Sequence, residues 1–259
     1  MIFDHRLFEL YAEKKRDQQK AVPWVIKALI WLFKLPLTAW VLTPLEWTLS
    51  VVFNLKIPIY QELLHIFFTQ IPGQPRLFGN YLRAIYYKGQ LKSMGKNVLI
   101  EEGVRFASPQ TVEIGEFVLI DKSVRIELAS LRVGHHSHIC VGVTMLGSGS
   151  VDIGNYCAVS HGAMLITSTE SPHGGARMSS TMVSFKERNV QVAPITLKNE
   201  AFVGARATLM PGVTVEEGGV IGAGVLAFHG TQAWEIKYGR IPENLITKTR
   251  EQVKNFGPL

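Results

Sequence analysis

Hydrophobic positions recur every six residues through the second half of the chain. Between residues 195 and 230 an aliphatic side chain returns at this fixed spacing, and a small or β-branched residue stands four positions after each one. An α-helix repeats at about 3.6 residues and a strand at about 2, so the period fits neither. It predicts a solenoid that turns a corner every six residues, with the aliphatic residue in the core. The aliphatic positions are Leu197, Val203, Leu209, Val215 and Ile221, and the small ones are Ala201, Ala207, Val213, Gly219 and Val225.

The same pattern extends upstream with small slips of frame. Each slip adds a residue or two, which a corner can absorb. The interval from Leu165 to Leu197 is much longer than one repeat, so a segment of about two dozen residues, 166–194, is expected to leave the coil and return. A β-sandwich of short strands is the alternative, but sandwich spacing does not hold to six over consecutive repeats. The upstream inward candidates are Ile100, Phe106, Ile114, Ile120, Ile126, Val133, Ile139, Ile153, Val159 and Leu165.

The first third of the chain has a different pattern. Residues 5–20 are predicted to form a short polar helix rich in basic residues. Residues 22–59 are strongly apolar and contain four tryptophans; Pro36 and Pro44 interrupt them, and Glu46 is the one charge between residues 35 and 55. Residues 60–93 are predicted to be helical, with a loop at 71–76 and an interfacial face of aromatic and basic residues over 81–92.

Three arrangements fit the apolar segment. The first is a monotopic anchor, in which helices broken near Pro44 lie in one leaflet. The second is a set of helices packed on the solenoid or on a neighbouring subunit, and the third is a single membrane span. Glu46 would be costly in hydrocarbon, which counts against the span. Tryptophan favours membrane interfaces, and Lys27, Lys34 and Lys56 flank the apolar pieces, so the monotopic anchor is favoured.

The charge of the chain agrees with a contact of this kind. The formal net charge is +6 with a pI near 9.3, and the mean hydropathy is +0.14. This combination favours an anionic or membranous partner. A nucleic-acid partner is not expected, because the sequence shows no zinc-finger, RNA-recognition or helix-turn-helix signature. Cys140 and Cys157 fall inside the repeat region and are interpreted as reduced packing residues. The first residues lack the pattern of a secretory signal.

The repeat resembles that of the hexapeptide-repeat acyltransferase family. The likeness rests on IGEFV at 114–118, IGNYC at 153–157 and IGAGV at 221–225. It is strongest to the sugar O-acetyltransferases of the galactoside, maltose and polysaccharide-biosynthesis type, through PITL at 194–197, FVGA at 202–205 and MPGV at 210–213. The resemblance implies a left-handed parallel β-helix, a homotrimer and a coenzyme A (CoA) thioester as acyl donor.

The expected fold is therefore mainly β, with three parts. Residues 1–93 form a helical N-terminal region that is membrane-associated over 22–59. Residues 94–235 form the left-handed β-helix acyltransferase domain with the excursion at 166–194. Residues 236–259 form a closing segment that ends in a short helix.

Two histidines are candidates for the catalytic base. Transfer of an acyl group from a thioester to a hydroxyl needs a base for the hydroxyl proton, and neutral histidine suits this role. The resemblance places the base at His173, in the excursion, although Pro172 precedes it where the family has the order His-Pro. His161, two residues after inward Val159, is the second candidate. The asparagine that the family usually carries on the preceding coil has no counterpart at 140–143.

No metal is expected. His135, His136 and His138 form a cluster that looks like a metal site. However, the repeat points Ser137 inward and these histidines outward, and no cysteine or carboxylate pair at zinc spacing accompanies them.

The resemblance implies that CoA lies along the outside of the last coils. The matching small residues are Gly204, Ala205, Gly222 and Ala223. The phosphates of CoA need cations, and Lys237, Arg240 and Lys248 follow the last coil.

These features predict an acetyl-CoA-dependent O-acetyltransferase. Its acceptor would be a glycan precursor or a lipid- or nucleotide-linked sugar. An N-acyltransferase or a longer-chain acyltransferase on the same fold is an alternative, and so is a non-catalytic β-helix scaffold. Because CoA is cytosolic, the expected location is cytoplasmic, peripheral or monotopic on the inner membrane.

Overall fold

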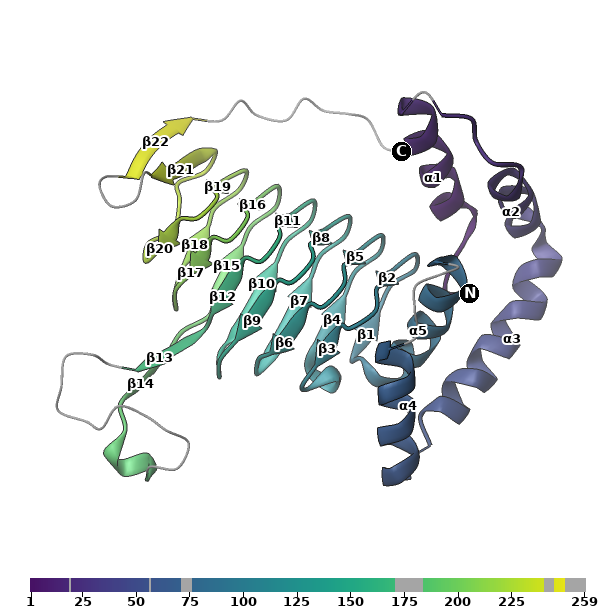
Figure 1. Cartoon of the computed structure of the whole chain (residues 1–259), viewed down its shortest axis with the longest axis horizontal. Coiled ribbons are helices and arrows are strands. Elements are labelled where there is room, and N and C mark those ends of the chain that lie inside the picture. The colour runs from purple at the N-terminus through teal and green to yellow at the C-terminus, as the bar shows by residue number, and fades with distance from the viewer. Residues whose placement is uncertain (19, 56, 71–75, 171–183, 240–244, 250–259) are drawn as a thin grey trace.

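A solenoid of short strands forms most of the molecule, and five helices gather at its N-terminal end (Figure 1). The computed structural model describes the chain except for residues 19, 56, 71–75, 171–183, 240–244 and 250–259. The strands of the coils stack in three sheets, which are parallel except at the C-terminal edge of one of them, and each full turn of the chain contributes one strand to each sheet. The predicted parallel β-solenoid with N-terminal helices is confirmed.

The three sheets divide the strands in regular order along the chain. The first sheet holds β1 (Ser93–Met94), β4 (Val112–Ile114), β7 (Ser130–Val133), β10 (Ser150–Ile153), β15 (Ile195–Leu197) and β18 (Thr214–Val215). The second holds β2 (Leu99–Ile100), β5 (Leu119–Ile120), β8 (His138–Ile139), β11 (Ala158–Val159), β16 (Phe202–Val203), β19 (Val220–Ile221), β21 (Glu235–Gly239) and β22 (Leu245–Thr249). The third holds β3 (Arg105–Phe106), β6 (Arg125–Glu127), β9 (Thr144–Leu146), β12 (Met164–Ile166), β17 (Thr208–Leu209) and β20 (Leu226–Ala227). A short 3₁₀ turn, η1 (Pro109–Thr111), precedes β4.

The repeat in the sequence is the core of this solenoid. Every predicted inward aliphatic residue is buried, and so are the small residues four positions after it. Equivalent residues stack in columns: Ile120 pairs with Ile139 in register, and Val159 with Val203. Each column is a continuous row of aliphatic side chains, which the hydrophobic effect stabilises.

The excursion is also where the sequence places it. After β12 the chain leaves the coil as β13 (Ser168–Glu170), and it returns as β14 (Val190–Val192), which pairs with β13 in antiparallel register. Another 3₁₀ turn, η2 (Phe185–Glu187), lies near the returning strand. Figure 1 shows this arm projecting away from the stacked coils.

The helices are α1 (His5–Asp17), α2 (Trp24–Lys34), α3 (Pro36–Phe53), α4 (Pro58–Gln70) and α5 (Arg76–Gln90). The expected break near Pro44 is wrong, because Pro44 lies inside α3. The chain instead bends by 87° between α2 and α3, at Leu35. Leu35 is extended, with φ −73° and ψ 129°, because the ring of Pro36 disfavours a helical residue before it. Pro36 itself stands at the start of α3, where its missing N–H costs nothing.

Within the described residues, no single helix is both long enough and apolar enough to cross a bilayer. α2 and α3 meet the length and composition criteria only as a pair, with the 87° bend between them.

Helix α5 covers the first coil of the solenoid and is not the interfacial helix expected over 81–92. Arg83, Tyr86 and Tyr87 are buried. Arg83 Nε donates to the carbonyl oxygen of Ile100 at 2.7 Å, and the Tyr87 hydroxyl donates to that of Val104 at 3.0 Å. The open end of a solenoid has unpaired backbone groups, and α5 satisfies two of them.

The predicted closing helix is also wrong where the structure describes it. Residues 245–249 form β22, which pairs antiparallel with β21 at the C-terminal edge of the second sheet. Three of its five residues, Ile246, Thr247 and Thr249, are β-branched, and such residues favour a strand over a helix.

Candidate functional site

The corner between the second and third sheets carries most of the predicted site residues. Each coil contributes three residues to it, and these stack directly on those of the next coil: 121–123, 140–142, 160–162, 204–206 and 222–224. We call this row the site corner. Backbone bonds hold the coils together there, with Arg206 N donating to His161 O at 2.9 Å and Gly224 N to Ala205 O at 2.8 Å.

His161 is exposed on the site corner. The register that pairs Val159 with Val203 and Val203 with Ile221 places His161, Ala205 and Ala223 in one column. An exposed imidazole therefore precedes a row of small side chains on the next two coils.

The small residues of the corner have two different reasons to be small. A Cβ atom on Gly204 would lie 2.4 Å from the backbone nitrogen of Ala223, so Gly204 is required by the packing of one coil on the next. Gly222 is similarly close to Tyr238 on the following strand. Ala205 is half-buried and Ala223 is exposed, so these two present the outer surface that a ligand would contact.

One cluster on this corner was missed in the sequence. His138 Nε2 lies 2.8 Å from Asp121 Oδ2 on the preceding coil, and His138 Nδ1 lies 3.7 Å from Cys140 Sγ. Asp121 and Cys140 occupy equivalent positions on successive coils, directly after inward Ile120 and Ile139. Aligning successive coils on Ile120 and Ile139 could have brought Asp121 next to Cys140 and His138. A search for zinc-ligand spacing within one short segment could not, because Asp121 lies on the preceding coil.

The donor atoms of these three residues lie within 4.8 Å of one another. Thiolate, imidazole and carboxylate groups are ligands that zinc binds in proteins. The absence of a metal from the reaction therefore stays a prediction, which metal analysis of the purified protein would check. In the structure the His138 ring contacts the other two groups through its two different nitrogens.

The pKa of His138 is raised to about 9, first by its hydrogen bond to Asp121 and then by that to Cys140. At neutral pH this ring is consequently a cation with both nitrogens engaged, which makes it a poor base. His136 is stacked between Phe117 and Tyr156, with ring centroids 4.9 and 5.1 Å away. His135 Nδ1 accepts from Glu116 N at 3.0 Å. Of the predicted base candidates, His161 is the one within the described residues.

The Asp121–His138 pair predicts a pH-dependent stability. Because the folded pKa of His138 lies above its ordinary value of 6.5, the pair stabilises the fold fully below that value and ceases to do so as the pH rises through about 9. Asp121→Asn should therefore lower the free energy of unfolding at about pH 6 and have little effect at about pH 10. Urea unfolding at both pH values measures this. Asp152→Asn is the control, because it breaks an exposed pair with Arg132 whose effect should not change over this window.

Several predicted positions carry less information. His173 and Arg240 lie outside the described residues. Lys248 belongs to β22, where its backbone pairs with Ile236. Cys157 is buried as predicted, its thiol donating to Lys198 O at 2.9 Å, and burial raises its pKa to about 11, so it is not a nucleophile at neutral pH.

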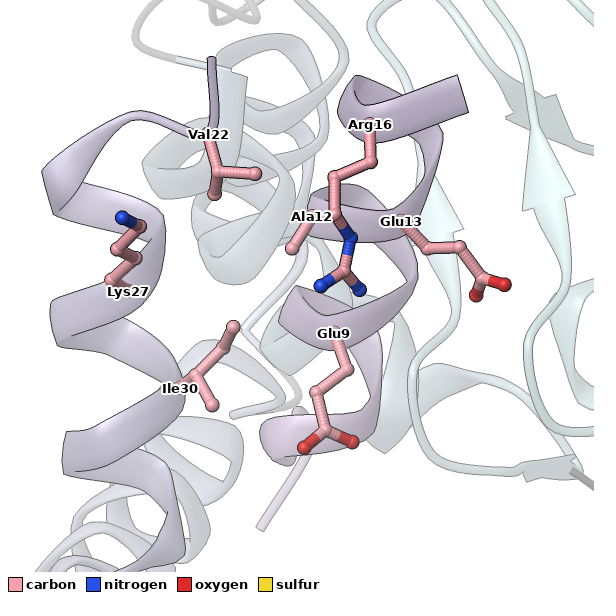
Figure 2. Close-up of a pocket in the computed structure, with 7 residues that line it drawn as sticks. All are labelled: Glu9, Ala12, Glu13, Arg16, Val22, Lys27 and Ile30. Carbon is pink, nitrogen blue, oxygen red and sulfur yellow. The ribbon is translucent and has the colours of Figure 1, made fainter. Parts of the chain in front are cut away.

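Two cavities lie away from the site corner. One has a volume of about 340 Å³ and lies between α1 and α2, lined by Glu9, Glu13, Arg16 and Lys27 together with apolar residues (Figure 2). Another of about 220 Å³ lies on the outer face of the first sheet, beside the ion pair of Arg132 and Asp152. Neither is lined by His161.

Comparison with known proteins gives a consistent picture. No family model matches the chain. It is 26% identical over 176 residues to a dTDP-4-amino-4,6-dideoxy-D-glucose acyltransferase of Escherichia coli, which covers 67% of this chain and 91% of the relative. It is 37% identical over 62 residues to a 2,3,4,5-tetrahydropyridine-2,6-dicarboxylate N-succinyltransferase of Alkalilimnicola ehrlichii, a match limited to 23% of that enzyme.

A solved structure extends the likeness to the fold. The N-acyltransferase AntD of Bacillus cereus, in complex with dTDP and 3-hydroxybutyryl-CoA, superposes with a TM-score of 0.58 at 26% identity. The match covers 69% of this chain and 88% of AntD. The solved neighbours are left-handed β-helix acyltransferases, which is the handedness that the resemblance in the sequence implied.

Proposed function

Because its homologues are hexapeptide-repeat acyltransferases, we propose that this chain transfers an acyl group from CoA to a sugar carried on a nucleotide. The observation that carries the proposal is the column of His161, Ala205 and Ala223 on the site corner. This column combines an exposed base with a track of small residues. The solenoid that carries both is the fold shared with AntD, whose structure holds 3-hydroxybutyryl-CoA.

In this mechanism the acceptor approaches His161 while the thioester lies along the column towards Ala223. The imidazole accepts the proton of the attacking amino or hydroxyl group as that group bonds to the acyl carbon. The tetrahedral intermediate then collapses and the carbon–sulfur bond breaks; the imidazolium returns the proton to the sulfur, so that CoA leaves as the thiol and His161 is neutral again. His173, in the excursion, is the rival base and is tested alongside His161.

The relatives favour an amino group as the acceptor. The E. coli relative is an acyltransferase for a dTDP-linked amino sugar, and AntD is an N-acyltransferase. The predicted O-acetylation remains the second candidate, because an exposed histidine base is what a hydroxyl acceptor requires. Acetyl-, succinyl- and 3-hydroxybutyryl-CoA should be tested against dTDP-4-amino-4,6-dideoxyglucose and its 4-hydroxy counterpart, with thiol release as the measurement. Thiol release with neither acceptor, and no binding of CoA by calorimetry, would leave the scaffold alternative.

The donor track predicts a binding effect that can be separated from folding. Ala223→Glu should place a bulky anionic side chain in the track and weaken CoA binding by roughly tenfold or more, since it adds both a clash and charge repulsion. The fold should be unaffected because Ala223 is exposed. Calorimetric titration with CoA measures the change, with Thr214→Glu on the first sheet as the control. Unchanged affinity would show that CoA does not occupy this column.

We further propose that the enzyme is a homotrimer. The exposure of His161 and Ala223 in a single chain supports this, because a neighbouring subunit would supply a second wall for the donor track. Light scattering of the full chain in mild detergent should give three times the monomer mass. An active monomer would contradict the shared site.

A further inference from the structure

The second and third helices expose an unusual amount of apolar surface. Every residue of α2 and α3 is described, and Glu46 is the only one of them that is fully buried. Trp24 and Trp31 are 78% and 66% exposed, and Trp40 and Trp47 are 76% and 70% exposed. Within each helix the two tryptophans are seven residues apart, so they lie two turns apart on one side of the helix. We call the exposed side of α2 and α3 the tryptophan face.

Glu46 fixes which side of α3 faces outward. Glu46 is 5% exposed, and its carboxylate accepts from the Tyr81 hydroxyl at 2.7 Å and from Ile2 N at 2.9 Å. Leu49 and Phe53, on the same side of the helix, pack against the core. The one charge of the apolar segment is therefore paired inside the protein. The opposite side of α3, which bears Trp40 and Trp47, is left facing outward.

The exposed ionisable residues of α2 and α3 themselves are both lysines. The ionisable residues of α2 and α3 are Lys27, Lys34 and the buried Glu46, and Lys34 Nζ forms an ion pair with Glu9 Oε1 of α1 at 2.8 Å. The adjacent end of α1 adds Lys14, Lys15 and Arg16 in its last turn. An apolar surface bordered by lysines matches an anionic lipid surface, in which the tryptophans enter the interface and the ammonium groups meet phosphates.

We propose that the tryptophan face docks this protein on an anionic lipid bilayer, with α2 and α3 lying in the interface and the solenoid outside it. A second copy of the chain fits this face less well, because a symmetric contact would bring Lys27 close to its own counterpart. The 87° bend between α2 and α3 and the hydrogen bond that holds Glu46 inside the protein both count against a straight membrane span. This docking does not depend on the acyltransferase proposal.

Vesicle flotation of the full chain tests the proposal. The protein should float with vesicles of equal parts phosphatidylcholine and phosphatidylglycerol, bind less to phosphatidylcholine alone and dissociate partly at high salt. Brominated lipids should quench tryptophan fluorescence in the bound state. If the protein floats with neither kind of vesicle, the proposal is wrong.

Paired variants locate the surface. Trp40→Gln/Trp47→Gln should weaken binding roughly a hundredfold, because about tenfold is expected for each tryptophan removed from the interface. Lys27→Gln should weaken binding to the anionic vesicles about fivefold. The matched control is Phe202→Gln/Phe228→Gln, which removes two exposed aromatic residues from the solenoid and should leave binding unchanged. Circular dichroism checks that each variant is folded.

Light scattering without lipid tests whether the tryptophan face instead binds a second copy of the chain. If the tryptophan pair variant reduces the oligomeric mass and the wild type does not bind vesicles, the face is an interface between copies and the proposal is wrong. Unchanged vesicle binding by the tryptophan pair variant would also overturn it. A wild type that binds vesicles and a tryptophan variant that fails to bind them at unchanged mass would support it.

Discussion

Replacing His161 with alanine should lower turnover roughly 10² to 10⁴-fold while leaving the affinity for CoA nearly unchanged. The imidazole is exposed on the site corner and its ring can accept a proton from an acceptor that approaches from outside. Its removal takes away a group used in the transition state but not in donor binding, so kcat should fall and the dissociation constant of CoA should not. Steady-state kinetics and calorimetry with CoA together measure the two effects.

Two further variants decide between the candidate bases. His229→Ala removes another exposed histidine of the solenoid, at the end of the last coil, and should leave turnover unchanged. His173→Ala tests the excursion. If turnover falls with His173→Ala and not with His161→Ala, the base belongs to the excursion and the assignment to His161 is wrong.

Arg83→Met should destabilise the fold by about 3 kcal/mol, the largest loss of stability that we expect from a single substitution of a buried residue. Arg83 is 0% exposed and donates to the carbonyl oxygen of Ile100 and to the side chain of Asn80. Methionine fills similar space but leaves those acceptors unpaired at the end of the solenoid. Urea unfolding followed by circular dichroism, at fixed protein concentration, measures the change.

Arg105→Met is the matched control for this loss. Arg105 lies on β3 with its side chain exposed, so the substitution should change the free energy of unfolding by about 0.5 kcal/mol or less. Equal effects at the two positions would show that the bond to Ile100 contributes little to the closure of the solenoid.

The solenoid could be predicted because its core residues follow a short, regular spacing along the chain. The inward columns depend on a spacing of six along the chain, which is visible without any knowledge of distant contacts. The excursion was predictable for the same reason, since it interrupts that spacing between Leu165 and Leu197. The burial of Cys157 followed from its place in the repeat.

What could not be predicted depends on contacts between separated segments. Arg83 looks like a surface cation in its own helix, and only the packing of α5 on the first coil makes it a buried donor. Glu46 looks costly until Tyr81 and Ile2 are seen to pair with it. Asp121 and His138 lie on different coils, so their contact and the raised pKa of the histidine require the three-dimensional register.

The cap formed by α5 also makes the solenoid a measure of length. Adjacent strands in a sheet are about 4.8 Å apart, so β2, beside the cap, and β11, just before His161, are separated by about 14 Å along the stack. This separation can change only in whole steps, because a coil is either present or absent. Removing residues 134–153 would join Val133 to the residue after Ile153, its partner in register, and draw His161 one step closer to the helices. The height of His161 above the helical end is therefore fixed in whole coils, by the number of repeats that precede it.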